Sequence, residues 1–433
     1  MHINTYNVNW ATAFNIREQN NTMAIKQAVV LAAGEGKRLR PLTYTRPKCM
    51  IQLAGKPILA HVLENLKAAG AREATIVVKY KKETIMDYFS KKDFGLKLNF
   101  VEQGEKYGTA AAFLCAEGFV TDTFFAVAGD IITEASALKR LASEHEGEVS
   151  ACLKAVEDAS EYGTAVLKAG RISSFEEKAK KPKSSLANCS LYAFEPSVFA
   201  KMRQVAPSKR GEYEVVDVLG GANAIEISEY WLDMGMPWQL FDANEFLLSK
   251  MQEKSGKVEN STVKGRLIME EGAVIHDSYI EGTVYVGANS YVGPHAYIRG
   301  TTAIGENCGI GDSTTLKNSI IFDSVNAKHL TYIGDSIVGS GCNFGAATQV
   351  ANFRFDALSI KAVVNDVVID TKRKKLGAII GDGVKTGVLS SIMPGKMVGD
   401  NCWVGAGVVV EQNVERNTHV MLRQDLQFKK RTE

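Results

Sequence analysis

Three features that would narrow the function of this 433-residue chain are missing from its sequence. No apolar run approaches the roughly 20 residues that a membrane-spanning helix needs. The seven cysteines are scattered, with no CxxC pair and no histidine at ligand spacing, which argues against a zinc site and favours buried thiols in a reducing compartment. The formal net charge of +2 gives no reason to expect a nucleic acid or a membrane as partner. We therefore expect a cytoplasmic globular protein.

The first 22 residues also lack the features of a targeting segment. They contain no apolar core, many asparagines and a single Lys or Arg, Arg17. Met23 stands just before the first expected strand, so we interpret residues 1–22 as a disordered extension. The length of the chain predicts two domains.

Between residues 26 and 250, short apolar strands alternate with helical stretches. The run AVVLAA (28–33) precedes ILAHVLENLKAAG (58–70), in which apolar residues recur at helical spacing and Gly70 ends the helix. Further strands are expected at 74–80, 96–102 and 123–130. This alternation predicts a parallel sheet with helices on both faces, a Rossmann-like α/β domain over 23–250. Ligands of such sheets bind beyond the carboxyl ends of the strands.

The second half of the chain repeats a six-residue pattern instead. One position in six carries an apolar residue or tyrosine, except at Thr386: Ile268, Val274, Ile280, Val286, Val292, Ile298, Ile304, Ile310, Leu316; Tyr332, Val338, Phe344, Val350; Ile380, Thr386, Ile392, Val398, Val404 and Val410. Hexapeptide repetition is typical of a parallel β-helix with coils of about 18 residues. We expect a left-handed parallel β-helix over 266–433, with residues 251–265 as a polar linker.

A glycine turn with basic residues follows the first expected strand, in GEGKRLRP (34–41). It is neither a Walker A motif nor a GxGxxG, because Leu39 stands where the third glycine belongs. Glycines let backbone N–H groups approach an anion, and basic side chains add charge. For Lys37 and Arg40 we favour a solvated surface, whereas Arg38 and Lys48 belong to a wider set of motifs.

That set resembles the sugar-1-phosphate nucleotidylyltransferases. The matching motifs follow in order: LAAGEGKRLRPLTYTRPKCMIQLAGKP (31–57), QGEKYGTAAA (103–112), AGD (128–130), YGTAVL (162–167), FEEKAKKPKSSLANCSLYAF (175–194), GEYEVVD (211–217) and WLDMGMP (231–237). The resemblance implies that Arg38 and Lys48 neutralise the triphosphate beside the turn at Gly34. It also implies that Asp130 and Asp233 hold Mg²⁺ between the two substrates.

The same resemblance implies the residues that bind base and sugar. Gln103 and the loop at Gly108 and Thr109 would read a pyrimidine base. The sugar would be held by Gly163, Glu177 and Asn188, with Lys178 near its phosphate. Both reactants are anionic, so the metal and the cations must offset their repulsion while a phosphate oxygen attacks the α-phosphorus of UTP.

The β-helix carries a second resemblance at the two interruptions of its repeat, 322–332 and 351–378. AKHLTYIGDSIVGSGCNFGAATQVANF (327–353) is similar to the acetyltransferase half of the bifunctional glucosamine-1-phosphate acetyltransferase/N-acetylglucosamine-1-phosphate uridylyltransferases, and the longer second interruption is similar to that of archaeal members. The resemblance implies an acetyl-CoA-dependent site with His329 as general base, since an imidazole titrates near neutrality. It further implies ligand-binding residues: Tyr332, Asn343 and Asn352 for the amino sugar; Arg299, Lys317 and Lys375 for its phosphate; Ala346, Ala406 and Arg423 for acetyl-CoA.

Arg299 and Lys317 can also be judged from the repeat alone. Each follows an inward-facing residue and they lie 18 residues apart, so the coil stacks them directly. Stacked like charges repel unless an anion lies between them, which favours a phosphate site.

Three hypotheses remain open on the sequence. The leading one is a homotrimeric bifunctional enzyme that uses small-molecule sugar phosphates. The second is a glucose-1-phosphate uridylyl- or thymidylyltransferase with a structural β-helix, and the third is a non-catalytic assembly subunit. UTP or dTTP, and glucosamine or galactosamine, also stay open.

Overall fold

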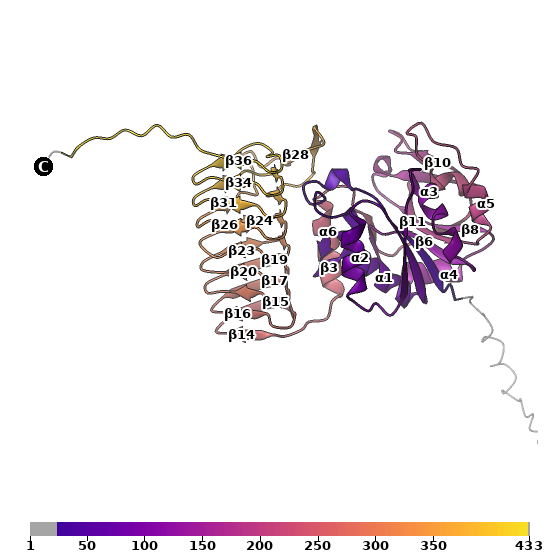
Figure 1. Cartoon of the computed structure of the whole chain (residues 1–433), viewed down its shortest axis with the longest axis horizontal. Helices are drawn as coiled ribbons and strands as arrows, with labels where there is room; N and C mark the ends of the chain where they lie inside the picture. The colour runs from indigo at the N-terminus through magenta and orange to yellow at the C-terminus, as the bar shows by residue number, and fades with distance from the viewer. Residues whose placement is uncertain (1–23, 432–433) are drawn as a thin grey trace, which may run out of the picture.

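The computed structural model describes residues 24–431, so the extension expected at 1–22 lies outside the described residues. An α/β domain and a β-helix lie side by side, and the carboxyl-terminal residues extend away from both (Figure 1). Within residues 24–431 no helix has the length and apolar character needed to cross a membrane.

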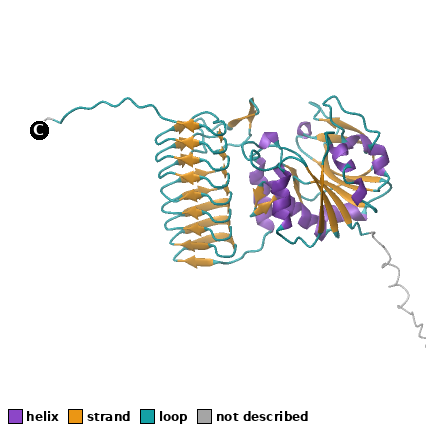
Figure 2. Ribbon diagram, in the orientation of Figure 1, coloured by secondary structure: helices purple, strands orange, loops and turns teal. Residues whose placement is uncertain are grey.

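One nine-stranded sheet forms the centre of the first domain. Its order is β5-β4-β1-β6-β11-β8-β12-β10-β9. The bounds are β1 (Gln27–Ala32), β4 (Glu73–Val78), β5 (Lys97–Glu102), β6 (Phe124–Ala128), β8 (Val149–Ala155), β9 (Gly163–Lys168), β10 (Arg171–Glu177), β11 (Leu186–Phe194) and β12 (Asn223–Glu226). The helices are α1 (Ile58–Ala68), α2 (Lys82–Ser90), α3 (Thr109–Leu114), α4 (Ala135–Ser143), α5 (Val198–Met202) and α6 (Gln239–Lys250), and Figure 2 shows them on both sides of the sheet.

The sheet is mixed, which corrects the prediction of a parallel sheet: its first four strands are all parallel, whereas beyond β6 the strand pairs are antiparallel apart from β8 with β12. Strands β5, β4, β1 and β6 run parallel, as the strand–helix alternation predicts. Strand β11 then lies antiparallel between β6 and β8, because the β9–β10 hairpin reverses the chain before it. The parallel half is the part that carries the carboxyl-end loops after β1 and β6.

The second domain is a stack of coils made entirely of parallel strands. One face is a nine-stranded sheet of β14 (Lys257–Glu259), β16 (Val274–His276), β18 (Tyr291–Val292), β20 (Gly309–Ile310), β23 (Asn326–Ala327), β26 (Asn343–Phe344), β31 (Lys385–Thr386), β34 (Trp403–Val404) and β36 (His419–Val420). The other faces form a twelve-stranded sheet of β15 (Thr262–Met269), β17 (Tyr279–Val286), β19 (Tyr297–Ile304), β21 (Thr315–Lys317), β22 (Ile320–Ile321), β24 (Tyr332–Gly334), β25 (Ile337–Val338), β27 (Gln349–Val350), β30 (Ile379–Ile380), β32 (Ser391–Ile392), β33 (Met397–Val398) and β35 (Val409–Val410). The first coil begins at Lys257, inside the stretch expected as linker.

Most of the predicted six-residue positions point into the core of the β-helix, but three do not. Met269, Ile275 and Ile333 fill the core where Ile268, Val274 and Tyr332 were expected. Near Tyr332 the reason is a coil one residue short: Tyr279 pairs with Tyr297, 18 residues on, whereas Thr315 pairs with Tyr332, 17 residues on. Tyr332 therefore faces outward, where it can contact a ligand.

The long interruption at 351–378 forms a hairpin that joins the two domains. Strands β28 (Lys361–Val364) and β29 (Val367–Asp370) pair antiparallel, and their apolar side chains share a cluster with α6 of the first domain. Arg373, just after the hairpin, lies 3.0 Å from Asp242 and has its guanidinium over the Phe241 ring. This hairpin thus packs between the two domains.

A buried carboxylate, Asp400, makes stability depend on pH. Its side chain is almost inaccessible, and its Oδ2 has no hydrogen-bond partner within the described residues. Burial and the neighbouring Asp382 carboxylate raise the pKa of Asp400 from 3.8 to about 6, against the opposing effects of Arg416 and Arg46.

We expect Asp400→Asn to stabilise the protein at alkaline pH. Between about pH 4 and pH 6 the folded chain retains a proton that the unfolded chain has lost, so wild-type stability falls as pH rises through this window. The variant cannot ionise and should gain up to about 3 kcal/mol in free energy of unfolding at pH 8, with little gain at pH 4. Urea unfolding at both pH values measures this, and equal gains at the two would contradict it.

Candidate active sites

The first candidate site is a cleft beyond the carboxyl ends of β1 and β6. A cavity of about 590 Å³ lies there, lined by residues of six segments: the glycine turn 34–39, Lys48, Tyr107, Asp130, Glu212, and Met234 with Gly235. Asp130 follows β6 directly, and Asp233 ends β13 (Trp231–Asp233), which pairs with β7 (Ile131–Thr133) so that Asp233 lies opposite Ile131. The sheet edge thus gathers the four residues expected to be catalytic in nucleotidyl transfer, Arg38, Lys48, Asp130 and Asp233.

Lys48 is the centre of this cleft. Its Nζ lies 2.8 Å from Asp130 Oδ2 and 2.9 Å from Asp233 Oδ1. Burial lowers the pKa of Lys48, but the two carboxylates outweigh it and the net shift is upward, so the ammonium stays charged. Burial likewise raises the pKa of Asp233, yet Lys48, Arg38 and Lys178 together hold it below its usual value. The cleft is therefore an ionised cluster of both signs.

Two glycines let the backbone approach closely in this cleft. Gly36 has φ +68°, and a Cβ there would lie 2.8 Å from the Lys48 Cβ. Gly108 has φ +122°, and a Cβ there would lie 2.3 Å from the Tyr213 carbonyl oxygen. Both positions need glycine for reasons of conformation and of space.

The residues expected to read the base make contacts within the protein. The buried Gln103 amide donates to the backbone carbonyls of Lys106 and Gly108, at 3.0 and 3.4 Å. Thr109 Oγ1 accepts from the Val215 N–H at 2.8 Å. Gln103 and Thr109 therefore shape the loop around Gly108.

The residues expected to hold the sugar lie together on the second half of the sheet. Gly163 and Glu177 are register partners on β9 and β10, and a Cβ on Gly163 would come within 2.7 Å of Glu177 Oε2. Lys178 follows Glu177, and Asn188 on β11 is one residue from the pairing of Ala187 with Thr164. Asn188 exchanges hydrogen bonds with Tyr192 at 2.8 and 3.0 Å.

The donor set of the cleft fits a magnesium ion. Mg²⁺ prefers oxygen ligands and is held by one or two carboxylates together with water and substrate phosphates. Asp130 and Asp233 supply two carboxylates facing one point, occupied by the Lys48 ammonium. Among residues 24–431 no three His, Cys, Asp or Glu side chains gather as a metal site. The chain therefore offers a half-built site that substrate phosphates would complete.

The second candidate site follows one corner of the β-helix. His329 Nδ1 lies 3.2 Å from Asp312 Oδ2, and both side chains are more than half exposed. Ala347 bonds back to the His329 carbonyl, Leu389 to Ala346 and Gly407 to Val388. His329, Ala346, Val388 and Ala406 therefore occupy the same corner of successive coils, and three of them, His329, Ala346 and Ala406, are residues that the resemblance assigns to acetyl transfer.

Cationic and polar residues line the face beside this corner. Arg299 and Lys317 are direct register partners, which confirms the stacking inferred from their spacing. Lys317 Nζ contacts the buried Asp335 at 3.1 Å, and Asn352 also donates to Asp335. The Arg299 Nε is buried without a hydrogen-bond partner in the described part of the chain.

Tyr332 and Lys375 belong to the same group. A Cβ on Gly334 would meet both the Tyr332 hydroxyl and the Asn352 amide nitrogen, at 2.4 and 2.6 Å. Lys375 pairs with Phe353, the residue after Asn352. Five of the residues expected to bind the amino-sugar phosphate therefore lie on one face.

Two predicted residues do not join this group within one chain. Asn343 lies on β26 in the nine-stranded sheet, between Asn326 and Lys385, on a different face from Tyr332. Arg423 lies in the exposed, extended segment after β36. In a single chain neither residue contributes to the face around Arg299 and Lys317.

Comparison with known proteins decides the family. A family model described as nucleotidyl transferase matches residues 27–250, and one described as GMPPB C-terminal domain matches residues 280–414. The chain is 41% identical over 413 residues, covering 93% of its own length and 99% of the relative's, to the Bifunctional protein GlmU of Methanocaldococcus jannaschii. The chain belongs to the GlmU family.

Other members of the GlmU family give the same result. The Bifunctional protein GlmU of Methanococcus maripaludis strain S2 is 39% identical over 418 residues, 93% of this chain and 99% of that protein. A protein of Sulfurisphaera tokodaii named Bifunctional sugar-1-phosphate nucleotidylyltransferase/acetyltransferase is 34% identical over 400 residues, 90% of this chain and 98% of that protein. The family predicted from the motifs is confirmed, and the chain is a member of a family of enzymes.

The structure adds two residues of this GlmU-type chain that the sequence reasoning missed. Asp312 is placed to orient His329, and Asp335 ties Lys317 to Asn352. The coil length contained the signal for both, since Asp312 precedes His329 by 17 residues and Asp335 follows Lys317 by 18. Applying the repeat to polar residues as well as to apolar ones would have found them.

Proposed function

We propose that this chain acetylates glucosamine-1-phosphate with acetyl-CoA on its β-helix and then joins the product to UTP in its first domain. The products of the second step are UDP-N-acetylglucosamine and pyrophosphate. The observation that carries the proposal is the pairing of His329 with Asp312 beside the stacked cations Arg299 and Lys317, on a chain whose first domain also holds a cleft with Lys48 between the carboxylates of Asp130 and Asp233. The bifunctional names of its relatives support the same conclusion.

In the nucleotidyl transfer, the chain supplies charge and position. Arg38 and Lys48 attract the triphosphate to the glycine turn and neutralise the leaving pyrophosphate. Asp130 and Asp233 would hold Mg²⁺, which when bound offsets the repulsion between the two phosphates. Glu177 and Asn188 orient the sugar so that its phosphate oxygen attacks the α-phosphorus in line. A general base is unnecessary because the phosphate is already ionised.

In the acetyl transfer, His329 takes a proton from the attacking amine. With Asp312 accepting from Nδ1–H, Nε2 is left as the basic nitrogen that faces the substrate. Tyr332 and Asn352 bind the amino sugar, while Arg299 and Lys317 bind its phosphate. Lys375, opposite Phe353, would contact the same phosphate.

A trimer would complete the second site. We propose a left-handed β-helix that associates as a cytoplasmic homotrimer, in which Asn343 and Arg423 serve a neighbouring subunit. Both residues lie away from the Arg299 face of their own chain. Arg423 would then meet the phosphates of acetyl-CoA, with Ala346 and Ala406 along its path.

A substrate panel tests the proposal. Thiol release from acetyl-CoA would be measured with glucosamine-1-phosphate and with galactosamine-1-phosphate. Pyrophosphate release would be measured with N-acetylglucosamine-1-phosphate and either UTP or dTTP. We expect thiol release with glucosamine-1-phosphate and pyrophosphate release with UTP.

Other outcomes select the alternatives. Faster thiol release with galactosamine-1-phosphate would change the epimer and leave both reactions in place. With glucose-1-phosphate added to the panel as a further acceptor, pyrophosphate release from UTP or dTTP, without thiol release from acetyl-CoA on either amino-sugar phosphate, would make the β-helix structural. Neither release would indicate an assembly subunit.

A further inference from the structure

The segment Tyr44–Gln52 of the first domain lies along one corner of the β-helix. Asp323, Ser340, Asp382, Asp400 and Arg416 occupy this corner on successive coils, as backbone hydrogen bonds from the next coil show at each step. We call these five residues the docking corner. It differs from the corner of His329 and is occupied largely by acidic side chains.

Two side chains in the middle of the segment, Arg46 and Thr45, bind Asp382 of the docking corner. Arg46 forms an ion pair with Asp382, lies 3.4 Å from Ser340 Oγ and places its guanidinium over the Phe322 ring. Thr45 Oγ1 donates to Asp382 at 2.5 Å. The side chains of Arg46 and Asp382 are only 13% and 17% exposed, so the pair is well shielded from water.

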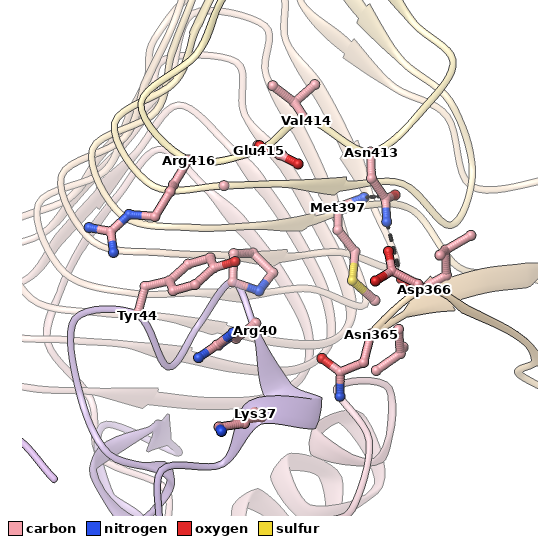
Figure 3. A pocket seen from close by; sticks show the side chains of 14 residues that line it. Lys37, Arg40, Tyr44, Asn365, Asp366, Met397, Asn413, Val414, Glu415 and Arg416 are labelled. Carbon is pink, nitrogen blue, oxygen red and sulfur yellow. Dashed lines mark hydrogen bonds between the residues drawn. The ribbon is translucent and has the colours of Figure 1, made fainter.

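The ends of the segment are fixed as well. Gln52 Nε2 donates to Asp323 at 2.6 Å. At the other end, the Tyr44 ring contacts the guanidinium of Arg416, with that of Arg40 on the same ring, each 5.0 Å from its centroid. Figure 3 shows Tyr44 between these two arginines, at the edge of a cavity of about 490 Å³ between the domains.

Lys48 lies in the middle of this clamped segment. Only Pro47, whose φ is fixed by its ring, separates it from Arg46. Pro47 also accepts the first hydrogen bond of the short turn Lys48–Met50, from the Met50 N–H at 2.9 Å. A shift of Arg46 is therefore passed on to Lys48 and to its contacts with Asp130 and Asp233.

We propose that Asp382 of the β-helix is a positioning residue for nucleotidyl transfer in the first domain. It acts through Arg46, which holds the Lys48 ammonium against the two carboxylates of the cleft. The β-helix thus serves more than its own acetyl-transfer site, because its docking corner also positions Lys48 in the nucleotidyl-transfer cleft. This inference rests on the proposed function of the cleft.

The test compares two interdomain ion pairs in the full-length protein. Asp382→Asn and Arg46→Ala break the pair next to Lys48, while Asp242→Asn breaks the pair with Arg373, which joins the segment after the hairpin to α6. We expect the first two variants to lose about tenfold or more in kcat/KM for nucleotidyl transfer, mostly in kcat, because small misplacements of a catalytic group are costly. Acetyl transfer should be unchanged, and Arg46→Ala/Asp382→Asn should lose no more than either single variant.

Two results would overturn the inference. Unchanged nucleotidyl transfer in a folded Asp382→Asn would show that the pair does not position Lys48. An equal loss in Asp242→Asn would show a general loosening of the domains.

A second measurement separates this inference from the proposed function. If the wild type transferred no nucleotide, the proposed function would fail. The inference would then be judged from acylation of Lys48 by an amine-reactive reagent, followed by mass spectrometry. Faster labelling of Lys48 in Asp382→Asn than in the wild type or in Asp242→Asn supports it, and equal rates contradict it.

Discussion

His329→Ala is expected to lose acetyl transfer by about 10²-fold to 10⁴-fold while nucleotidyl transfer stays at the wild-type rate. The imidazole is the only basic group that we assign to the amine, and removing it leaves the proton of the attacking nitrogen without an acceptor. Its side chain is 58% exposed and projects from a corner, so its loss leaves the core of the β-helix intact. Thiol release from acetyl-CoA and pyrophosphate release, measured on one preparation, give both rates.

His295 provides the matched control for this prediction. It lies on the same corner as His329 but on the second coil before it, since Ser313 bonds back to Pro294 and Leu330 to Asp312. His295→Ala should leave both activities unchanged. Asp312→Asn should reduce acetyl transfer by less than His329→Ala, because it disturbs the orientation of the imidazole and leaves the base in place. Acetyl transfer that survives in His329→Ala would refute the assignment of the base.

Removal of divalent metal should divide the two activities of the enzyme. Treatment with EDTA is expected to abolish nucleotidyl transfer and to leave acetyl transfer unchanged, because within residues 24–431 we assign a metal ion to the cleft of Asp130 and Asp233 and none to the β-helix. Added Mg²⁺ should restore the lost activity. Asp233→Asn should fall by about 10³-fold in nucleotidyl transfer even with saturating Mg²⁺, since electrostatic stabilisation by a bound metal contributes several kcal/mol.

The loss of activity expected in Asp233→Asn could have a second cause, which a comparison with Lys48→Ala tests. Asp233 also holds the Lys48 ammonium, at 2.9 Å, so its loss could act through the lysine. A loss through the metal is expected to shift the Mg²⁺ dependence of Asp233→Asn to higher concentrations, whereas Lys48→Ala should keep the wild-type dependence. An unchanged Mg²⁺ dependence in Asp233→Asn would contradict the metal assignment.

Much of this architecture follows from periodicity alone. The six-residue repeat predicts the coils, and the spacing of Arg299 and Lys317 predicts their register because a coil has nearly constant length. The strand–helix alternation predicts the parallel half of the first sheet and the edge where Asp130 lies. In both cases the same sequence pattern recurs many times along the chain, so a single residue that departs from the pattern does not change the predicted fold.

Periodicity does not predict which segments far apart in the sequence pack against each other. Nothing local indicates that β11 returns antiparallel between β6 and β8, or that the 351–378 hairpin packs on α6. The coil of 17 residues before Tyr332 also leaves no signal in the sequence pattern, because a tyrosine can lie either inside or outside a coil. Gln103 shows the same limit for a site residue, since its amide holds a loop that only the fold creates.

The contacts at the docking corner also constrain the number of coils in the β-helix. An insertion of one whole hexapeptide coil between Asp323 and Asp382 would keep every inward residue in the core, yet would displace Asp382 by about 4.8 Å along the stack. Arg46 and Gln52 could then no longer reach both of their partners. A coil added after Val420 would leave these contacts in place. The first domain therefore fixes the number of coils between Asp323 and Asp382, whereas the number of coils after Val420 is free to change.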